Sequence, residues 1–415
     1  MSQLLTDQST KPRIPVVVYV LCFNIMALGT TEFVIAGLLP ELADEFSVSI
    51  PTAGLFVSGF AVAMAVGAPV LAALTLRLPR RSTLMAAMAL FAAGHVLSAM
   101  AGTYGVFMAS RIVSAVATGA FWAVASVVTV SMVEARIRAR ALAVLIGGLT
   151  VANVAGVPLG TLVGQQLGWR STFWLLALLA VVGLVSVWRT VPADGAATSS
   201  RGVRAELGIF RAPRMWVALA TIALFQAAVM GWFSYLAPLL TDVAGMSESW
   251  VPAVLTLFGV GSLVGVQLGG RFGDGRPWHT LYGALGALSL GLALVAVSAG
   301  NPVLLGVAVL FVGVSAFTAA APVTSRVLGL AGPAPTLASA ATVTAFNVGN
   351  TVGPWLGGVT ISAGLGYRAP AAMALMLALS ALALGVLSRR MDGWRAAEPV
   401  EEAADCAPSA PCAAG

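Results

Sequence analysis

The chain has 415 residues, of which 59% are hydrophobic and only 9% are charged. Soluble domains carry about 25% charged residues, so this composition cannot build a water-facing surface and excludes an ordinary soluble protein. The formal net charge of +6 would by its sign suit nucleic acid. The basic residues are, however, placed as in a membrane protein, and no nucleic-acid partner is predicted.

Twelve apolar stretches are long enough to cross a lipid bilayer as α-helices, which takes about 20 residues each. Six precede a polar linker and six follow it, at 15–39, 51–75, 83–101, 104–130, 138–163, 171–190, 214–240, 250–270, 279–299, 302–326, 336–363 and 368–388. The connections are mostly short, so no soluble domain is inserted. The predicted fold is an all-α integral membrane protein with twelve transmembrane helices in two six-helix bundles.

The polar segments divide the chain into five parts. We expect an N-terminal segment over 1–14, a bundle over 15–190, a linker over 191–213, a second bundle over 214–390 and a tail over 391–415. The tail is rich in Ala, Pro and acidic residues, and it is predicted to be disordered.

The distribution of Lys and Arg predicts the orientation of the helices. All but three of the 22 Lys and Arg residues fall on one side of the predicted membrane. Arg170 and Arg368 lie on the opposite side, and Arg111 lies within a span. Because positive residues mark the cytoplasmic side, both termini and the linker are predicted to be cytoplasmic, in a multi-pass membrane protein.

The first span contains Glu32, the only acidic residue deep within any apolar stretch. A charged group at that depth costs roughly 2.5–3.5 kcal/mol on insertion scales, so it is expected to face a cavity and to have a function. Since removal from water favours the protonated form of a carboxyl group, Glu32 is predicted to carry protons and to contact the substrate. Asn24, about 80° away around the helix, is a second candidate ligand. A structural carboxylate neutralised by a neighbouring span is the alternative.

Two more ionisable residues lie in the third and fourth spans. Arg111 begins a stripe with Thr118 and Trp122 along one face of the fourth span, and a cation at that depth needs a partner. We predict that Arg111 lines the cavity and controls the protonation of Glu32, with snorkelling to the outer interface as the alternative. His95 in the third span is more simply interpreted as a packed, hydrogen-bonded group than as a proton carrier.

The fifth span carries a ridge of small residues at every fourth position, namely Gly148, Ala152, Gly156 and Gly160. Small residues let helix backbones approach closely in lipid, and Pro158 bends the span. We expect this segment to seal one end of the cavity, although ordinary helix packing would also use such a ridge. The eleventh span repeats the pattern in GPWLGG, so Gly353 and Pro354 are candidate gating residues too.

The loop after the eighth span combines opposite charges at Arg271, Asp274 and Arg276. Such charges could clamp one helix end in one conformation and release it in another, so these residues are predicted to act in gating. Membrane topology alone would require the arginines but not Asp274. The corresponding loop of the first half, LRLPRRSTL at 76–84, has the basic residues and lacks the Asp.

Aromatic and amide side chains complete the predicted binding site. An amphiphilic aromatic ligand would use aromatic faces and a few hydrogen-bonding groups, although Trp and Tyr also mark membrane interfaces. The candidates in the fourth, seventh and eleventh spans are Phe121, Trp122, Phe225, Gln226, Trp232, Phe233, Tyr235, Asn347 and Asn350.

Several of these motifs resemble those of the major facilitator superfamily. GRFGDGR at 270–276 resembles its loop motif, RIVSAVATGAFWA at 111–123 its fourth-span motif, and GVPLG at 156–160 the fifth-span motif of its antiporters. Within the drug:proton antiporter branch with twelve spans, GTTEFVIAGLLPELA at 29–43 and GVPLGTLVGQQLGWRSTFW at 156–174 are similar to bacterial chloramphenicol-resistance exporters, those of actinobacteria above all. Related sugar-efflux proteins share both.

The resemblance implies a proton-coupled exporter of a small hydrophobic or amphiphilic compound, chloramphenicol first and a sugar second. Its partners would be that substrate, protons and the lipid bilayer, and it would act as a monomer. It also implies proton coupling by Arg111 and gating by the fifth-span motif. The chain departs from the pattern where Val157 separates Gly156 from Pro158, and where the first-half loop lacks its Asp.

Other classes of function are disfavoured by the residues. No GxxxxGK[ST] motif is present, so ATP does not drive transport through this chain. Two His and one deep carboxylate assemble no catalytic dyad, triad or metal cluster, so we predict neither an enzyme nor a metal or cofactor. A channel would need a filter-like loop. A non-transporting receptor remains the alternative from another class.

Overall fold

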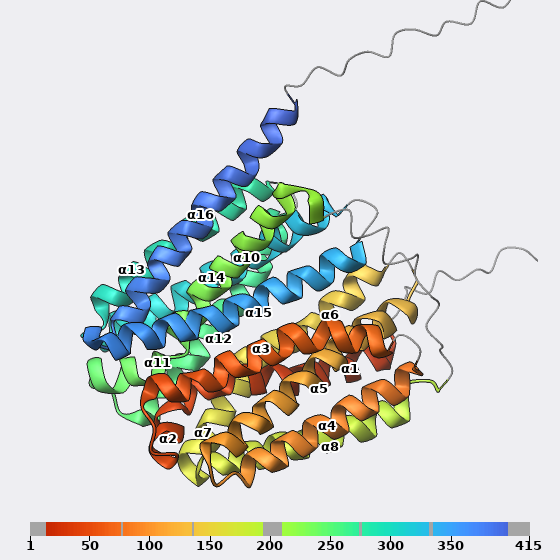
Figure 1. Cartoon of the computed structure of the whole chain (residues 1–415), viewed down its shortest axis with the longest axis horizontal. Helices are drawn as coiled ribbons and strands as arrows, with labels where there is room; N and C mark the ends of the chain where they lie inside the picture. Colours follow the sequence, from red (N-terminus) through yellow and green to blue (C-terminus); the bar gives the residue numbers. More distant parts are fainter. Residues whose placement is uncertain are drawn as a thin grey trace, which may run out of the picture.

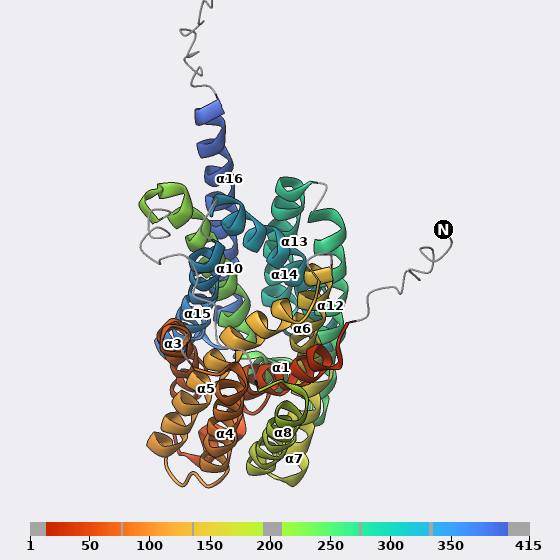
Figure 2. The same ribbon diagram turned by 90° about the vertical axis from the view of Figure 1, so that its right-hand side faces the viewer.

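The computed structural model describes residues 14–75, 78–134, 137–193, 210–273, 276–331 and 335–396. These segments form helices and turns, and no strand occurs among them. Long helices lie side by side along one direction (Figure 1). Viewed at a right angle, α3, α4, α5 and α8 lie below, while α10, α13, α14 and α16 lie above (Figure 2). The molecule therefore consists of two stacked bundles.

The N-terminal bundle contains six long helical segments, two of which are interrupted. Its elements are α1 (Val16–Phe33) continued by the 3-10 turn η1 (Val34–Gly37), the short α2 (Leu39–Glu45), α3 (Ile50–Thr75), α4 (Arg80–Ala99), α5 (Tyr104–Ser131), α6 (Arg138–Val151), the π-helical turn η3 (Ala152–Gly156), α7 (Val157–Leu167) and α8 (Trp169–Thr190). A π-helical turn directly before Pro158 joins α6 to α7, which agrees with the predicted bend of the fifth span.

The C-terminal bundle repeats this plan. Its elements are α10 (Pro213–Phe233), the short α11 (Leu236–Pro238) with η5 (Leu239–Val243), η6 (Glu248–Trp250), α12 (Val251–Gly273), α13 (Pro277–Ser298), α14 (Pro302–Leu330), α15 (Pro335–Thr360) with η7 (Ile361–Leu365), and α16 (Ala369–Ala396). Helix α16 continues past residue 391, where the tail was predicted to begin. Its last turns are held by ion pairs of Asp392, described below.

Eleven of the described helices are long and apolar enough to cross a membrane. The twelfth long helix, α15, carries Thr, Ser and Asn residues along its length. It packs against α10 and α16 within its own bundle and against α3 of the other, and Thr342, Asn347 and Asn350 are buried by this packing. The predicted all-α fold of twelve helices in two bundles is confirmed.

Both bundles use a ridge of small residues to bring two helices close together. In the first, a Cβ atom on Gly148 or Gly156 would collide with Cys22 O or Thr30 Oγ1 of α1. In the second, a Cβ on Gly353 or Gly357 would collide with backbone oxygens of α10. The ridge of the fifth span thus packs on α1, and that of the eleventh span packs on α10. These ridges join helices within a bundle rather than between bundles.

The basic residues mark one end of the molecule, which we call the arginine-rich end. There Arg80, Arg138, Arg214, Arg276 and Arg326 lie at helix termini or within their last turns. The other end, where α2, α11 and η6 lie, is called the opposite end.

Contacts between the bundles gather toward the opposite end. A Cβ on Gly54 of α3 would collide with the Tyr235 hydroxyl, and one on Gly358 would come within 2.8 Å of it. That hydroxyl donates to Pro354 O at 2.7 Å. Phe33 meets Phe233 edge-on at 6.1 Å between ring centroids. The bundles are therefore joined by interlocking backbone and aromatic surfaces.

Candidate functional site

Glu32 lies in the last turn of α1, at the junction of the two bundles. Its side chain stays partly exposed, whereas its neighbours Thr31 and Phe33 are buried. Asn350 of α15 donates a hydrogen bond from Nδ2 to Glu32 Oε1 at 2.9 Å, and Asn350 Oδ1 accepts one from Gln226 Nε2 of α10 at 2.7 Å. A carboxylate can only accept, so this chain of bonds fixes the orientation of both amides. Three predicted site residues are thus brought together across the bundle junction.

Arg111 is fully buried in α5 beside the same turn of α1. Its Nη2 donates to Thr31 O at 3.1 Å, and its guanidinium stacks over the Phe60 ring at 4.4 Å from the centroid. Glu32 attracts it electrostatically, yet in the described part of the chain no carboxylate oxygen lies within 4.0 Å of Arg111. Its Nε and Nη1 also lack a partner there. The predicted snorkelling alternative does not describe this buried position.

His95 of α4 completes the polar surroundings of Thr31. Its Nε2 lies 2.8 Å from Thr31 Oγ1, and its ring packs against Phe91 at 4.3 Å and Phe173 at 6.0 Å between centroids. The imidazole is fully buried. Thr31 is therefore held by His95 through its side chain and by Arg111 through its carbonyl, directly before Glu32.

Of the predicted aromatic residues, Phe233 and Tyr235 lie at the junction and Trp232 packs beside Phe233, and all three are buried. Trp232 and Phe233 are 1% and 2% exposed, and Phe233 contacts Phe258 of α12 at 4.5 Å between centroids as well as Phe33. In this conformation they fill space between the bundles. Trp232 Nε1 lacks a partner in the described residues, which leaves one donor for a ligand if the bundles separate.

The remaining substrate-site candidates lie away from Glu32. Asn24 is fully buried and faces α8, where a Cβ on Gly183 would collide with its Oδ1. Asn24 and Glu32 are offset by about 80° around α1. Asn24 therefore faces the interior of the N-terminal bundle, whereas Glu32 faces the other bundle. Phe121 is buried in the N-terminal core, and Trp122 packs toward Phe60 and Met64 of α3.

Within the C-terminal bundle, two more candidates are occupied by packing. Phe225 is buried and meets Phe346 edge-on at 6.4 Å between centroids. Asn347 donates only to Val343 O of its own helix at 3.0 Å, and its Oδ1 is buried without a partner in the described chain. Phe225 is thus held by packing alone, whereas the Oδ1 atom of Asn347 is an acceptor without a partner in the described chain.

The candidate gating residues separate into three groups. Gly156, Pro158 and Gly160 lie on or beside the ridge that packs against α1, and Gly353 and Pro354 lie on its counterpart against α10. The turn containing Gly156 touches the other bundle through its backbone, since a Cβ on Gly259 of α12 would collide with Asn153 O. Arg271 and Arg276 are exposed at the arginine-rich end. Asp274 lies outside the described residues.

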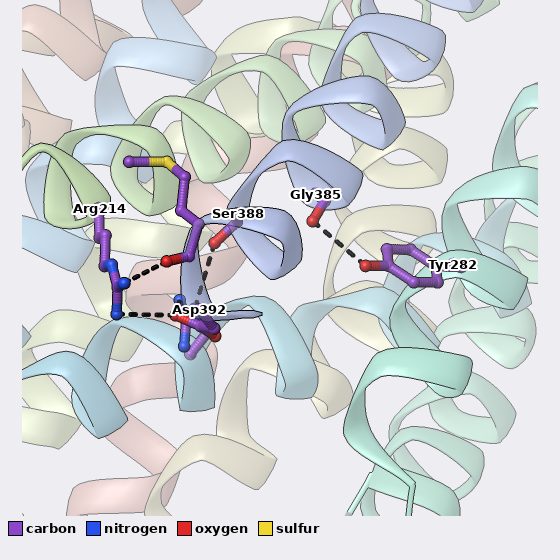
Figure 3. Close-up of polar contacts among 7 residues, drawn as sticks. Arg214, Tyr282, Gly385, Ser388 and Asp392 are labelled. Atoms are coloured by element: carbon purple, nitrogen blue, oxygen red, sulfur yellow. Dashed lines mark hydrogen bonds and ion pairs between the residues drawn. The ribbon is translucent and has the colours of Figure 1, made fainter. Parts of the chain in front are cut away.

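An ionic cluster that the sequence reasoning missed ties three helices of the C-terminal bundle together (Figure 3). Asp392 Oδ1 accepts from Arg326 at 2.7 Å and from Arg214 at 3.3 Å, and Arg326 Nε donates to Ser388 Oγ at 3.2 Å. Arg214 also bonds Met391 O. An acid two residues after a pair of arginines at the end of the last span was the available signal.

A mostly apolar cleft of about 420 Å³ opens between α5 and α6 at the arginine-rich end. It is lined by Ser126, Val127, Val130, Ser131, Arg138 and Leu142. Its size lies within the range of small-molecule sites.

Two related six-helix bundles, with a deep carboxyl group at their junction, define a polytopic membrane protein built from two similar halves. The model of the Major Facilitator Superfamily matches residues 21–343, and the chain belongs to this superfamily. The family resemblance predicted from the motifs is thereby confirmed.

Curated relatives support the assignment over most of the chain. A chloramphenicol resistance protein of Streptomyces lividans is 39% identical over 372 residues, covering 89% of this chain and 95% of the relative. The inner membrane transport protein YdhP of Escherichia coli is 38% identical over 370 residues, with the same coverage. The putative transporter AraJ of Escherichia coli is 31% identical, covering 92% and 97%.

Among solved structures, a bacterial homologue of the human lysosomal transporter Spinster, in an inward-facing and unoccupied conformation, has the same fold. It superposes with a TM-score of 0.71 over 90% of this chain and 96% of that one, at 16% sequence identity.

Proposed function

We propose that this protein is a proton-coupled secondary exporter of a small amphiphilic compound, with chloramphenicol as its first candidate substrate. It would reside in the bacterial cytoplasmic membrane with the arginine-rich end in the cytoplasm. The bond between Glu32 and Asn350 carries the proposal, because it joins the one deep carboxyl group of the described chain to the other bundle.

The proposed exchange takes place at Glu32. Ionised Glu32 accepts hydrogen bonds, from Asn350 in this conformation and from the hydroxyl groups of a substrate when the bundles part. Binding of a proton removes the charge that holds those donors and that attracts Arg111. Proton and substrate therefore compete for one group, which is the requirement for exchanging them in opposite directions.

The two bundles are proposed to rock about this site as rigid units, joined by the linker 191–213. Alternating access of this kind places the substrate site near the bilayer midplane. The cleft beside Arg138 would admit the compound from the cytoplasm. The fifth- and eleventh-span turns would close the opposite end, and the Arg271–Arg276 loop would control the arginine-rich end.

The proposal is tested by expressing the chain in a drug-sensitive bacterium and measuring the accumulation of labelled chloramphenicol with and without a protonophore. We expect low accumulation that rises when the proton gradient is collapsed. Accumulation equal to that of an empty vector, with the protein verified in the membrane, would reject chloramphenicol. A sugar-like metabolite would then be the leading substrate, because Gln226 and Asn350 supply the amides that a sugar site uses.

A further inference from the structure

The interface between α4 and α5 is unusually polar for the interior of a membrane bundle. His95, Ser98, Ser110 and Ser114 are each fully buried there. Burying polar groups is costly unless they are hydrogen-bonded. The corresponding helices of the C-terminal bundle, α13 and α14, bury mainly apolar residues such as Leu288 and Val312, and their buried hydroxyls Ser289 and Ser315 bond only to carbonyls of their own helices. The polar groups are therefore not required by the fold.

These side chains follow one another from the opposite end toward Glu32. Ser98 lies one residue from the end of α4 and shares a hydrogen bond of 2.7 Å with Ser110 of α5. His95 lies about one turn deeper on α4 and Ser114 about one turn deeper on α5. His95 then meets Thr31 Oγ1 at 2.8 Å, next to Glu32 in the chain.

Unused polar atoms lie between the two hydrogen-bonded pairs. His95 Nδ1 and Ser114 Oγ are both buried without a partner in the described residues. A Cβ on Gly94, the residue before His95, would collide with Ser114 Oγ, so Ser114 packs against the turn of α4 that carries His95. A buried donor or acceptor that is left unpaired is costly, which favours a transient occupant such as a proton-carrying water.

We propose that protons travel between the opposite end and Glu32 along this row of groups, which we call the hydroxyl–imidazole path: Ser98, Ser110, Ser114, His95 and Thr31. The inference rests on the proposed proton coupling at Glu32. A proton arriving at one ring nitrogen of His95 is balanced by release of the proton on the other nitrogen, so the ring returns to its starting charge. Thr31 likewise accepts one proton and passes on its own, and no electrons are transferred.

The charged groups nearest the path are Arg111 and Glu32. Arg111 donates to Thr31 O and so holds the backbone of the residue that carries the last hydroxyl of the path, directly before Glu32 in the chain. Ser98, in contrast, is linked only to Ser110 and to Gly94 O of its own helix at 3.1 Å. The hydroxyl–imidazole path thus begins at the neutral groups Ser98 and Ser110 and ends next to the ionisable residues Arg111 and Glu32.

The test separates proton delivery from structure with purified full-length protein in proteoliposomes. Two rates are measured with labelled chloramphenicol: transport driven by a pH gradient, and exchange against unlabelled chloramphenicol at equal pH on both sides. His95→Gln keeps an amide that can bond Thr31 but cannot pass a proton through a ring. We expect its gradient-driven rate to fall at least about tenfold, with exchange within about twofold of wild type.

Ser110→Ala and Thr31→Val provide independent variants should His95→Gln fail to fold, and both should slow only the gradient-driven rate. Ser315→Ala is the matched control, because Ser315 is a buried hydroxyl of α14 that bonds only Phe311 O of its own helix. Equal loss of both rates, or no loss in any path variant, would overturn the path. A wild-type protein whose transport ignores the pH gradient would instead reject the proposed proton coupling itself.

Discussion

Helices α1 and α10 occupy equivalent places in their bundles, each packed against a ridge of small residues. At the junction α1 presents the carboxyl group of Glu32, with Arg111 and His95 behind it. Helix α10 presents the amide of Gln226 and the rings of Trp232 and Phe233. The same backbone plan thus holds ionisable groups in one half and neutral ones in the other.

This difference assigns separate tasks to the halves. A neutral amide can donate a hydrogen bond to an ionised carboxyl group, and it does not itself gain or lose a proton. Asn350 can therefore respond to the charge of Glu32 without titrating itself. We infer that the N-terminal bundle binds and releases the proton at Glu32. The C-terminal bundle responds to the charge of Glu32 through Asn350.

The largest expected effect comes from removing the charge of Glu32 in the N-terminal bundle. Glu32→Gln should abolish gradient-driven export, by at least about 100-fold, because Gln imitates the protonated acid permanently. Substrate binding should weaken as well, because Gln, like the protonated acid, lacks the charge proposed to hold the substrate hydroxyl groups. The rate of export in everted membrane vesicles as a function of pH measures the effect. Glu45→Gln is the control, since Glu45 is a surface acid paired with Arg170 at the opposite end. Wild-type pH dependence in Glu32→Gln would contradict the division of tasks.

A smaller effect is expected from the amide partner in the C-terminal bundle. Asn350→Leu leaves both Glu32 and Gln226 without this partner, at a cost of about 1–3 kcal/mol, so we expect export to fall roughly tenfold. Asn347→Leu is the matched comparison, because Asn347 donates only to its own helix, and it should stay within about twofold. Equal effects of the two substitutions on initial export rates would show that the bond between the bundles does not matter.

The charged loop of the C-terminal bundle should give a change of a few-fold. Asp274→Asn is expected to slow turnover more than it weakens binding, because it alters the balance between two conformations rather than the site. Distances between spin labels on the two bundles should shift toward opening at the arginine-rich end. A loss of transport explained entirely by loss of affinity would count against a gating role.

The last expected effect is on the pH dependence of the conformation rather than on the export rate, and it concerns Glu41, at the opposite end where the bundles meet. Burial, aided by the negative charges of Glu248 and Asp44, raises the pKa of Glu41 from 4.5 to about 6, although Gln165 and its own backbone N–H oppose the rise. The packed arrangement therefore gains stability from protonated Glu41. This gain is fully present below pH 4.5 and is lost as the pH rises through about 6, amounting to at most about 2 kcal/mol.

Distances across the opposite end, measured between pH 4 and 8, check this prediction. The wild-type protein should open more readily as the pH passes about 6. Glu41→Gln should remove that dependence and behave throughout as the protein does at low pH. If Glu41→Gln retained the wild-type pH response, that response would arise from another titratable group.

The helices could be predicted because their signal is local. Apolar runs of about 20 residues set the spans within a few residues, as with 51–75 and α3 (Ile50–Thr75). Glu32 could likewise be identified as a candidate from the sequence, because it is the only acidic residue deep within an apolar stretch. The end of α16 was misjudged because its last turns depend on Arg214 and Arg326, which are far away in the sequence.

A site residue could be predicted only where the sequence of its own helix was sufficient to identify it. Contacts between different helices could not be predicted in this way. The bond of Glu32 with Asn350 joins residues from different bundles, and no periodicity within a span reveals such a partner. Asn24 was a reasonable candidate by spacing, but its position around α1 turns it to α8. His95 was correctly interpreted as hydrogen-bonded; its partner Thr31 lies on another helix.

The fit of Tyr235 between Gly54 and Gly358 has a consequence for the evolution of the protein. A tyrosine from one half requires a missing side chain in the other, so the two halves are matched in shape at this point. Exchanging one bundle for that of a relative should succeed only when the incoming half brings a residue that complements this socket. A change in either half at this point is therefore constrained by the residue that the other half presents to it.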